Sequence, residues 1–183
     1  MKKTDQEIID SVRNWFEKAV LGLSLCPFAA KPYKQGSISF KLSKAIDDES
    51  CLIDLFLNLQ KLDQQPEIET LVLIIPGHFK IFTDYNQFLN LVDSLLEKQG
   101  WAGIYQVASF HPDYVFAGCD EDDRANWTNR SPYPLLHLIR EDSISKAVEF
   151  YPDIDEVPHR NEEVLNSLSE AEMKEIFGKG YKK

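Results

Sequence analysis

Cysteine is scarce in this sequence of 183 residues, and no two of its three cysteines have the C-x-x-C spacing of a metal or redox motif. An odd number of scattered cysteines fits free thiols in a reducing compartment better than a disulfide framework. The amino terminus lacks the apolar segment of a signal peptide, and no run approaches the roughly 18 apolar residues of a membrane span. We therefore expect a cytoplasmic protein without membrane association.

Positively charged residues are also few: the sequence has 20 Lys and Arg residues against 30 Asp and Glu residues, which gives a net charge of -10. Nucleic-acid binding is driven by Lys and Arg that neutralise phosphates, so we expect no nucleic-acid partner. A small anionic ligand held by a few local arginines remains compatible with this balance.

Familiar cofactor motifs are missing as well. The sequence contains no G-x-G-x-x-G, no P-loop and no G-x-S-x-G, which argues against the common nucleotide-binding and serine-hydrolase sites. No motif identifies a cofactor, and nothing in the sequence defines an oligomeric state.

The length predicts one globular domain over residues 1–183, large enough to bury about 70% of the surface that its unfolded chain exposes. The tail at 178–183 is expected to be frayed. Apolar periodicity, capping boxes and prolines predict helices and strands in alternation. The expected elements are a helix over 5–24 ended by Pro27, a strand near 38–42, a helix after Asp47, a strand over 71–75, a helix from about Asp84 to Gly100, a strand over 104–110 and two short helices over 159–168 and 169–177.

This order favours an α/β fold with a mostly parallel sheet of three to four strands, flanked by helices and followed by a C-terminal helical extension. An α+β ferredoxin-like fold is the alternative. If the strands that end at Ile75 and Phe110 run in the same direction, His78 and His111 emerge at the same carboxyl edge of the sheet. Open α/β sheets bind ligands at that edge.

The stretch from Phe110 to Glu141 has too little apolar periodicity for a core segment and too many aromatic residues for a disordered loop. We interpret it as a rigid site loop that leads into a helix, with Ser131 as its cap and Pro132 in its first turn. This helix is expected to reach about Phe150. Turned at 100° per residue, it places His137, Arg140 and Glu141 in one sector.

An anion site is predicted from Arg130, the helix start at Ser131, and Arg140. Free N–H groups at a helix start attract anions, and arginine adds a bidentate fork. Asn129, Tyr114 and His78 are expected to contribute further substrate contacts. The alternative is that both arginines form structural bridges with Glu141 or with the acidic run at 120–123.

Four residues are candidates for catalysis: His111, His137, Glu141 and Cys26. His111 is our choice for a general acid or base, because it follows a strand and its unperturbed pKa lies near neutrality; its alternative role is to hold the loop by hydrogen bonds. His137, with Glu141 four residues on, is a second acid/base candidate or a structural helical histidine. Cys26 is a nucleophile if a histidine or a helix end lowers its pKa, and otherwise a buried thiol.

A metal site formed by His111, His137 and either Asp113 or Glu141 has suitable ligand types. No H-E-x-x-H or C-x-x-C pattern supports it, so we assign no metal ligand.

Three motifs resemble a bacterial and plant family known as domain of unknown function 1415. They are LSLCPFA around Cys26, QVASFHPDY from Gln106 to Tyr114, and NRSPYP from Asn129 to Pro134, which runs into HLIRE. The resemblance covers roughly residues 10–165, with small departures at Ser24 and Ile139, where asparagine and leucine are expected. The family carries no activity that could be transferred, so the resemblance supports the choice of segments alone.

The sequence thus predicts an enzyme that acts on a small anionic substrate, a phosphate or carboxylate, with His111 as its acid/base. One alternative is a non-catalytic binding or scaffold protein in which the same residues form a structural polar network. Another is a metal-dependent hydrolase.

Overall fold

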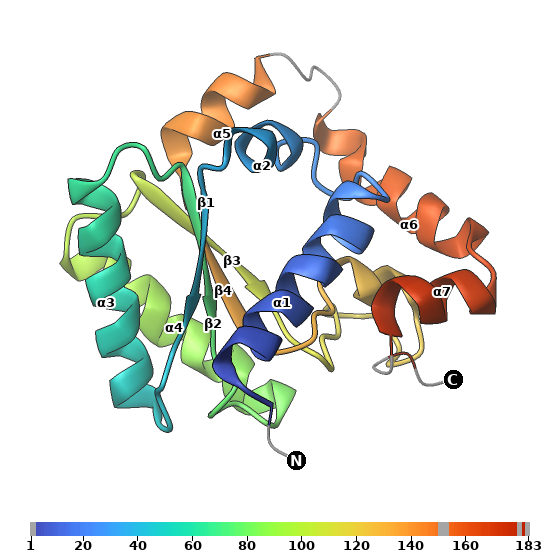
Figure 1. Cartoon of the computed structure of the whole chain (residues 1–183), viewed down its shortest axis with the longest axis horizontal. Helices are drawn as coiled ribbons and strands as arrows, with labels where there is room; N and C mark the ends of the chain where they lie inside the picture. Colours follow the sequence, from blue (N-terminus) through green and yellow to red (C-terminus); the bar gives the residue numbers. More distant parts are fainter. Residues whose placement is uncertain (1–2, 150–153, 179–180, 182–183) are drawn as a thin grey trace.

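A four-stranded sheet with helices on both faces forms the centre of the structure (Figure 1). The structure is a computed structural model and describes residues 3–149, 154–178 and 181. Its elements are α1 (Asp5–Trp15), η1 (Phe16–Leu21), α2 (Ala30–Gln35), β1 (Ile38–Leu42), α3 (Asp48–Gln64), β2 (Thr70–Ile74), α4 (Phe82–Lys98), β3 (Tyr105–Phe110), η2 (Arg124–Thr128), β4 (Leu135–Arg140), α5 (Glu141–Val148), η3 (Ile154–Glu156), α6 (Val157–Ser167) and α7 (Glu170–Phe177).

The strand order is β1-β2-β4-β3, and it corrects the prediction of a mostly parallel sheet. Only β1 and β2 pair in parallel, whereas β4 is antiparallel to both β2 and β3. The α/β character and the number of strands agree with the prediction. The ferredoxin-like alternative does not fit, because the chain order is β-α-β-α-β-β rather than β-α-β-β-α-β.

The strand β4 replaces the helix that was predicted from Ser131 to about Phe150, the last residue of which lies outside the described residues. Its leucines are buried on both sides: Leu136 and Leu138 pack with one core cluster and Leu135 with the other. Six residues are too few for periodicity to separate a buried strand from a buried helix turn. The helix starts only at Glu141, as α5, and Ser131 caps nothing, because its hydroxyl donates to the Tyr133 carbonyl at 2.6 Å.

One face of the sheet is covered by α3 and α4, which lie on the left in Figure 1. Leucines spaced along α3 and Tyr85, Phe88 and Val92 of α4 pack against Leu71 and Leu73 of β2. The predicted cap of α3 is confirmed, since the Asp47 carboxylate accepts from the Ser50 N–H at 2.8 Å.

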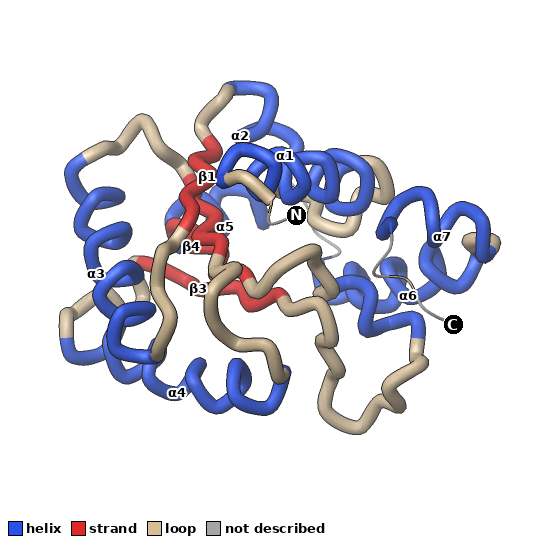
Figure 2. Tube along the Cα trace, turned by 60° about the horizontal axis from the view of Figure 1, so that its bottom comes forward, coloured by secondary structure: helices blue, strands red, loops and turns tan. Residues whose placement is uncertain are grey.

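The opposite face is covered by α1 and η1, with α6 and α7 beyond them, as both views show (Figures 1 and 2). Val12, Trp15 and Phe16 pack on Phe40, Val72 and further apolar side chains of the sheet. A capping box formed by Thr4 and Glu7 starts α1.

The predicted first helix over 5–24 is interrupted by a π-helix, η1, which ends at Leu21. Gly22 closes it: its N–H donates to the Glu17 carbonyl at 2.9 Å, and a Cβ atom at Gly22 would lie 2.3 Å from the Lys18 carbonyl oxygen. Any larger residue would therefore displace the backbone of this turn. π-Helical turns are rare and are frequently found at functional sites.

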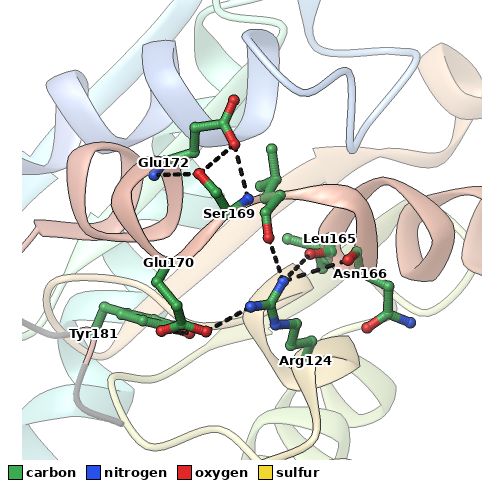
Figure 3. Close-up of polar contacts among 8 residues, drawn as sticks. Arg124, Leu165, Asn166, Ser169, Glu170, Glu172 and Tyr181 are labelled. Atoms are coloured by element: carbon green, nitrogen blue, oxygen red, sulfur yellow. Dashed lines mark hydrogen bonds and ion pairs between the residues drawn. The ribbon is translucent and has the colours of Figure 1, made fainter.

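The two C-terminal helices are joined to η2 by the side chain of Arg124 (Figure 3). Its guanidinium donates to the carbonyls of Leu165 at 3.1 Å and Leu168 at 2.5 Å, where α6 ends, and pairs with Glu170 of α7 at 2.7 Å. Of the tail predicted to be frayed, only Gly178 and Tyr181 are described, and the Tyr181 ring packs on Trp127.

Replacing Arg124 with methionine is expected to lower the free energy of unfolding by about 2 kcal/mol, because carbonyls at the end of α6 and one carboxylate lose a charged donor. Urea unfolding measures this loss, and hydrogen exchange should show that α6 and α7 lose protection while β2 keeps it. Arg124→Lys should show a smaller loss. Unchanged exchange in α6 after Arg124→Met would contradict the assigned role.

Candidate functional site

His111, the predicted acid/base, lies directly after β3 and is only 1% exposed. Its Nε2–H donates to the Phe79 carbonyl at 2.8 Å, and its Nδ1 accepts from the Asp113 N–H at 3.0 Å. Burial lowers the pKa of His111, so the ring is held neutral. With both nitrogens bound to backbone, this histidine holds two loops together, the alternative role considered from the sequence.

The rest of the loop after β3 is fixed by its own polar side chains. Arg130 donates to the Tyr114 carbonyl at 3.0 Å and the Glu121 carbonyl at 2.6 Å, and its guanidinium lies over the Trp127 ring. Asn129 donates to the Ser109 carbonyl at 3.0 Å. Arg130, Asn129 and Ser131 are thus engaged with backbone carbonyls. The Tyr114 ring packs against the rings of Phe82 and Phe116.

Arg140 is not brought together with Arg130, because it ends β4 opposite the first residue of β3, at the other end of the sheet. It donates to the Leu62 carbonyl at 2.5 Å and the Ile68 carbonyl at 3.2 Å, around the end of α3. Its remaining amino group donates to the Tyr105 hydroxyl at 3.1 Å.

His78 and His111 do emerge at the same edge of the sheet, because β2 and β3 run in the same direction on either side of β4. His78 contacts the Asp48 carboxylate at 2.7 Å, where α3 begins. Glu141 is separated from His137 by the change of structure: a strand residue and the first helical residue after it do not share the i, i+4 face of one helix.

A cavity of about 1170 Å³ lies at the other end of the sheet, between α2 and α5. These two helices are seen together at the top of Figure 1. Three of the predicted site residues line it, His137, Cys26 and Arg140, whereas His111, Arg130, Ser131, Asn129, Tyr114, His78 and Glu141 do not. Its walls are largely apolar and include Pro27, Phe28, Pro32, Ile38, Pro66, Ile139, Ile144 and Ile154.

His137 projects from the middle of β4 towards this cavity, on the face that carries Val72 and Ala108 of the neighbouring strands. Its Nε2 hydrogen-bonds to the hydroxyl of Thr70, and burial lowers its pKa to about 4. The ring is therefore neutral at pH 7. Among the described residues its Nδ1 has no hydrogen-bond partner. Unlike the unpaired Trp15 Nε1 and Asn161 Oδ1, this atom is not fully buried. Because His137 lines the cavity, Nδ1 is accessible from there.

The thiol of Cys26 lies in the same cavity, in the turn between η1 and α2. Burial raises its pKa, and hydrogen bonds from the backbone of Phe28 and Ala29 oppose this shift without reversing it. The thiol is therefore protonated at pH 7. Two residues of α6 hold this turn by hydrogen bonds: Asn161 donates to the Leu25 carbonyl at 2.8 Å, and Arg160 donates to the Ser24 carbonyl at 2.6 Å.

The π-helix supports the cavity directly. The ring of Phe16, its first residue, packs edge-on against the His137 ring at 6.3 Å between centroids and stacks on Tyr33 of α2 at 5.8 Å. The Tyr33 hydroxyl donates in turn to Glu17. The irregular helix therefore positions both the floor and one wall of the cavity.

Charged side chains line the cavity as well. Lys31 of α2 and Lys146 of α5 are exposed, and neither forms an ion pair with a carboxylate of the described residues. Glu67, Glu69 and Asp142 also line the cavity, so its formal charges are mixed.

The described part of the chain contains no group of three or more His, Cys, Asp or Glu side chains that could hold a metal ion. The ligand set considered from the sequence is not assembled, because the two nitrogens of His111 are occupied by backbone groups. None of the described helices is long and apolar enough to cross a membrane.

Thr70 was missed by the sequence reasoning. It precedes the apolar run of β2 as an ordinary strand residue, and only the register of β2 with β4 reveals that it contacts His137. The cavity itself could have been anticipated in part from Cys26 and His137, both of which were named as candidates on chemical grounds.

Fold and site together define an α/β protein with a cavity of small-molecule size on one face of its sheet, floored by a neutral histidine. A family model described as "Protein of unknown function (DUF1415)" matches residues 7–175, and the chain belongs to this family. No curated protein and no solved structure matches the chain.

Proposed function

We propose that the chain is a small cytoplasmic enzyme that binds a small organic anion, a carboxylate or phosphate, in the cavity between α2 and α5, with His137 as its acid/base. The observation that carries this proposal is the neutral imidazole of His137, which offers an unpaired, accessible nitrogen inside a largely apolar cavity. Cavities with apolar walls and a few convergent polar groups are the usual binding sites for small molecules. The acid/base role thus moves from His111 to His137.

The anionic part of the ligand is assigned to Lys31 and Lys146. Both lysines line the cavity and have no carboxylate partner among the described residues, so a ligand anion would gain a charge interaction that the protein leaves unmet. The apolar walls would hold the body of the ligand by removing it from water.

An anionic ligand would also make His137 a better base. Burial lowers the pKa of His137 to about 4, which favours acceptance of a hydrogen bond over removal of a proton. A negative charge brought close to the ring favours its charged form and raises its pKa towards neutrality. The ligand would therefore help to activate the residue that acts on it.

One observation favours the non-catalytic alternative. The loop after β3 is saturated by internal hydrogen bonds, as expected for a structural network in a binding or scaffold protein. This alternative accounts for the loop, but it assigns no role to the unpaired nitrogen of His137.

A thermal-shift experiment with matched probes tests the proposal. Phenylacetate and phenyl phosphate carry an apolar ring and an anion, and benzyl alcohol is the uncharged control. If a probe binds with a Kd of about 1 mM, a concentration of about 10 mM should stabilise the protein by about 1.4 kcal/mol. For a chain of this size the melting temperature should then rise by about 2–4 °C per kcal/mol.

His137→Gln and Lys31→Gln should each abolish most of this shift. The matched controls are His159→Gln and Lys34→Gln, which change exposed residues outside the cavity and should keep it. A shift that is equal for the anions and benzyl alcohol would remove the assignment of an anion. A shift that survives His137→Gln unchanged would place the site elsewhere.

A further inference from the structure

Thr70 holds an unusual position beside the cavity histidine. It is the first residue of β2, it is 5% exposed, and its hydroxyl has two partners across the β2–β4 pairing. The oxygen lies 2.8 Å from the Leu138 carbonyl and also contacts Nε2 of His137. Two hydrogen bonds therefore meet at a hydroxyl that has one hydrogen to give.

The direction of both bonds follows from counting protons. A carbonyl oxygen only accepts, so the Thr70 hydrogen must point to Leu138 if that bond is made. Thr70 Oγ1 then has only lone pairs for His137, and Nε2 must carry the hydrogen of this second bond. Because the ring is neutral, Nδ1 is left with a lone pair.

We infer that Thr70 is a positioning residue that fixes the tautomer of His137 and so makes Nδ1 the atom that accepts a hydrogen from the ligand. The opposite tautomer would face the threonine oxygen with a second lone pair, or it would turn the hydroxyl away from the Leu138 carbonyl and leave that acceptor unmet. Either arrangement loses a hydrogen bond inside the fold, which makes that tautomer a minor species. Hydroxyl-to-imidazole contacts of this kind set which nitrogen is available for chemistry.

This inference rests on the proposed function where it concerns the ligand, and it narrows the class of ligand. An acceptor nitrogen selects molecules that present an O–H or N–H group to it. Lys31 and Lys146 select the anion. The class that satisfies both is a hydroxy or amino carboxylate, or the corresponding phosphate, with an apolar side group.

His111 supplies an internal reference for the test. Its Nε2–H donates to the Phe79 carbonyl and its Nδ1 accepts from the Asp113 N–H, so it has the same tautomer for reasons that do not involve Thr70. A change at Thr70 should therefore alter the signals of His137 and leave those of His111 unchanged.

The experiment uses the full chain labelled with ¹⁵N in the histidine side chains, at pH 7, as wild type, Thr70→Val and Thr70→Ser. The His137 signals are identified by their absence in His137→Gln. Wild type and Thr70→Ser should show His137 with a protonated Nε2 and an unprotonated Nδ1. Thr70→Val, which keeps the shape and β-branching of threonine, should show a mixture of tautomers.

A His137 signal with the hydrogen on Nδ1 in the wild type would overturn the inference. So would an unchanged His137 tautomer in Thr70→Val. If the valine variant does not fold, wild type and Thr70→Ser still decide the matter, because the predicted tautomer must be present in both.

The ligand class is tested with two carboxylates that differ by one hydroxyl, 3-phenyllactate and 3-phenylpropionate. Wild type should bind phenyllactate about tenfold more tightly, the effect of one additional hydrogen bond, and Thr70→Val should lose most of this preference. Equal affinity of the wild type for both probes would overturn the assigned class. If neither probe binds while His137 has the predicted tautomer, the proposed function fails and the role of Thr70 stands.

Discussion

Replacing Arg140 with methionine should lower the free energy of unfolding by about 4 kcal/mol, since several acceptors around the end of α3 lose a charged donor at once. The guanidinium donates hydrogen bonds to the carbonyls of Leu62, Gln65 and Ile68 and to the hydroxyl of Tyr105. Methionine keeps the apolar stem and offers no hydrogen, so these part-buried oxygens would lose their charged donor.

Urea unfolding of the two proteins measures this effect, with an unchanged m-value as the sign that only stability has altered. Arg13→Met is the matched control: Arg13 is exposed on α1, its side chain lies over the Phe40 ring, and its replacement should cost no more than about 1 kcal/mol. Arg140→Lys should recover only part of the loss, because one ammonium group cannot reproduce the planar fork of arginine. A loss below about 1 kcal/mol for Arg140→Met would contradict the role assigned to this residue.

Acid should destabilise the protein well before its carboxylates titrate, and His137 should be the main cause. Burial depresses its folded pKa to about 4, below the value of 6.5 that describes the unfolded chain. Between these values the unfolded state binds more protons than the folded state, so stability falls as the pH falls. From pH 7 to pH 5 the loss should be about 2 kcal/mol.

Unfolding in urea at pH 7, 6 and 5 tests this expectation. His137→Gln should remove most of the decrease, while His159→Gln, on the exposed face of α6, should behave like the wild type. Some decrease should remain in His137→Gln, because the pKa of His111 is also lowered by burial. If the wild type is equally stable at pH 7 and pH 5, His137 is not held neutral by burial and the description of the cavity is wrong.

Local features of the fold could be predicted from the sequence where the cause is itself local. Capping boxes start α1 at Thr4 and α7 at Ser169, where a hydroxyl can accept from a backbone N–H. Gly100 follows α4 with a left-handed backbone, which glycine adopts because it has no side chain. The apolar run of β2 is buried at every position, as a strand with both faces covered must be.

The errors concern interactions between distant residues. Leu135–Arg140 was predicted as a helix because its apolar spacing fits both a helix and a strand. It forms a strand because it pairs with β2 on one side and with β3 on the other. The π-helix has no signal in the sequence except Gly22, whose requirement follows from the backbone around it.

The chemical types of the site residues could be predicted from the sequence, but their positions in the fold could not. His137 and Cys26 were named from their side chains, and they line one cavity. His111 and Arg130 were named on the same grounds, yet each is bound to backbone oxygens away from the cavity. Arg140 also lines the cavity, but its guanidinium is bound to backbone oxygens around the end of α3. A titratable side chain has the same appearance in a sequence whether it faces a cavity or completes a loop, because its partners come from other elements.

We propose that the cavity floored by His137, rather than the loop after β3, is the functional site. The most direct measurement is a titration of the ¹⁵N-histidine-labelled chain with 3-phenyllactate, in which each of the four histidines reports on its own surroundings. We expect a progressive shift of the His137 signals, with those of His78, His111 and His159 unchanged. Shifts at His78 or His111 while His137 stays constant would contradict it and return the site to the loop.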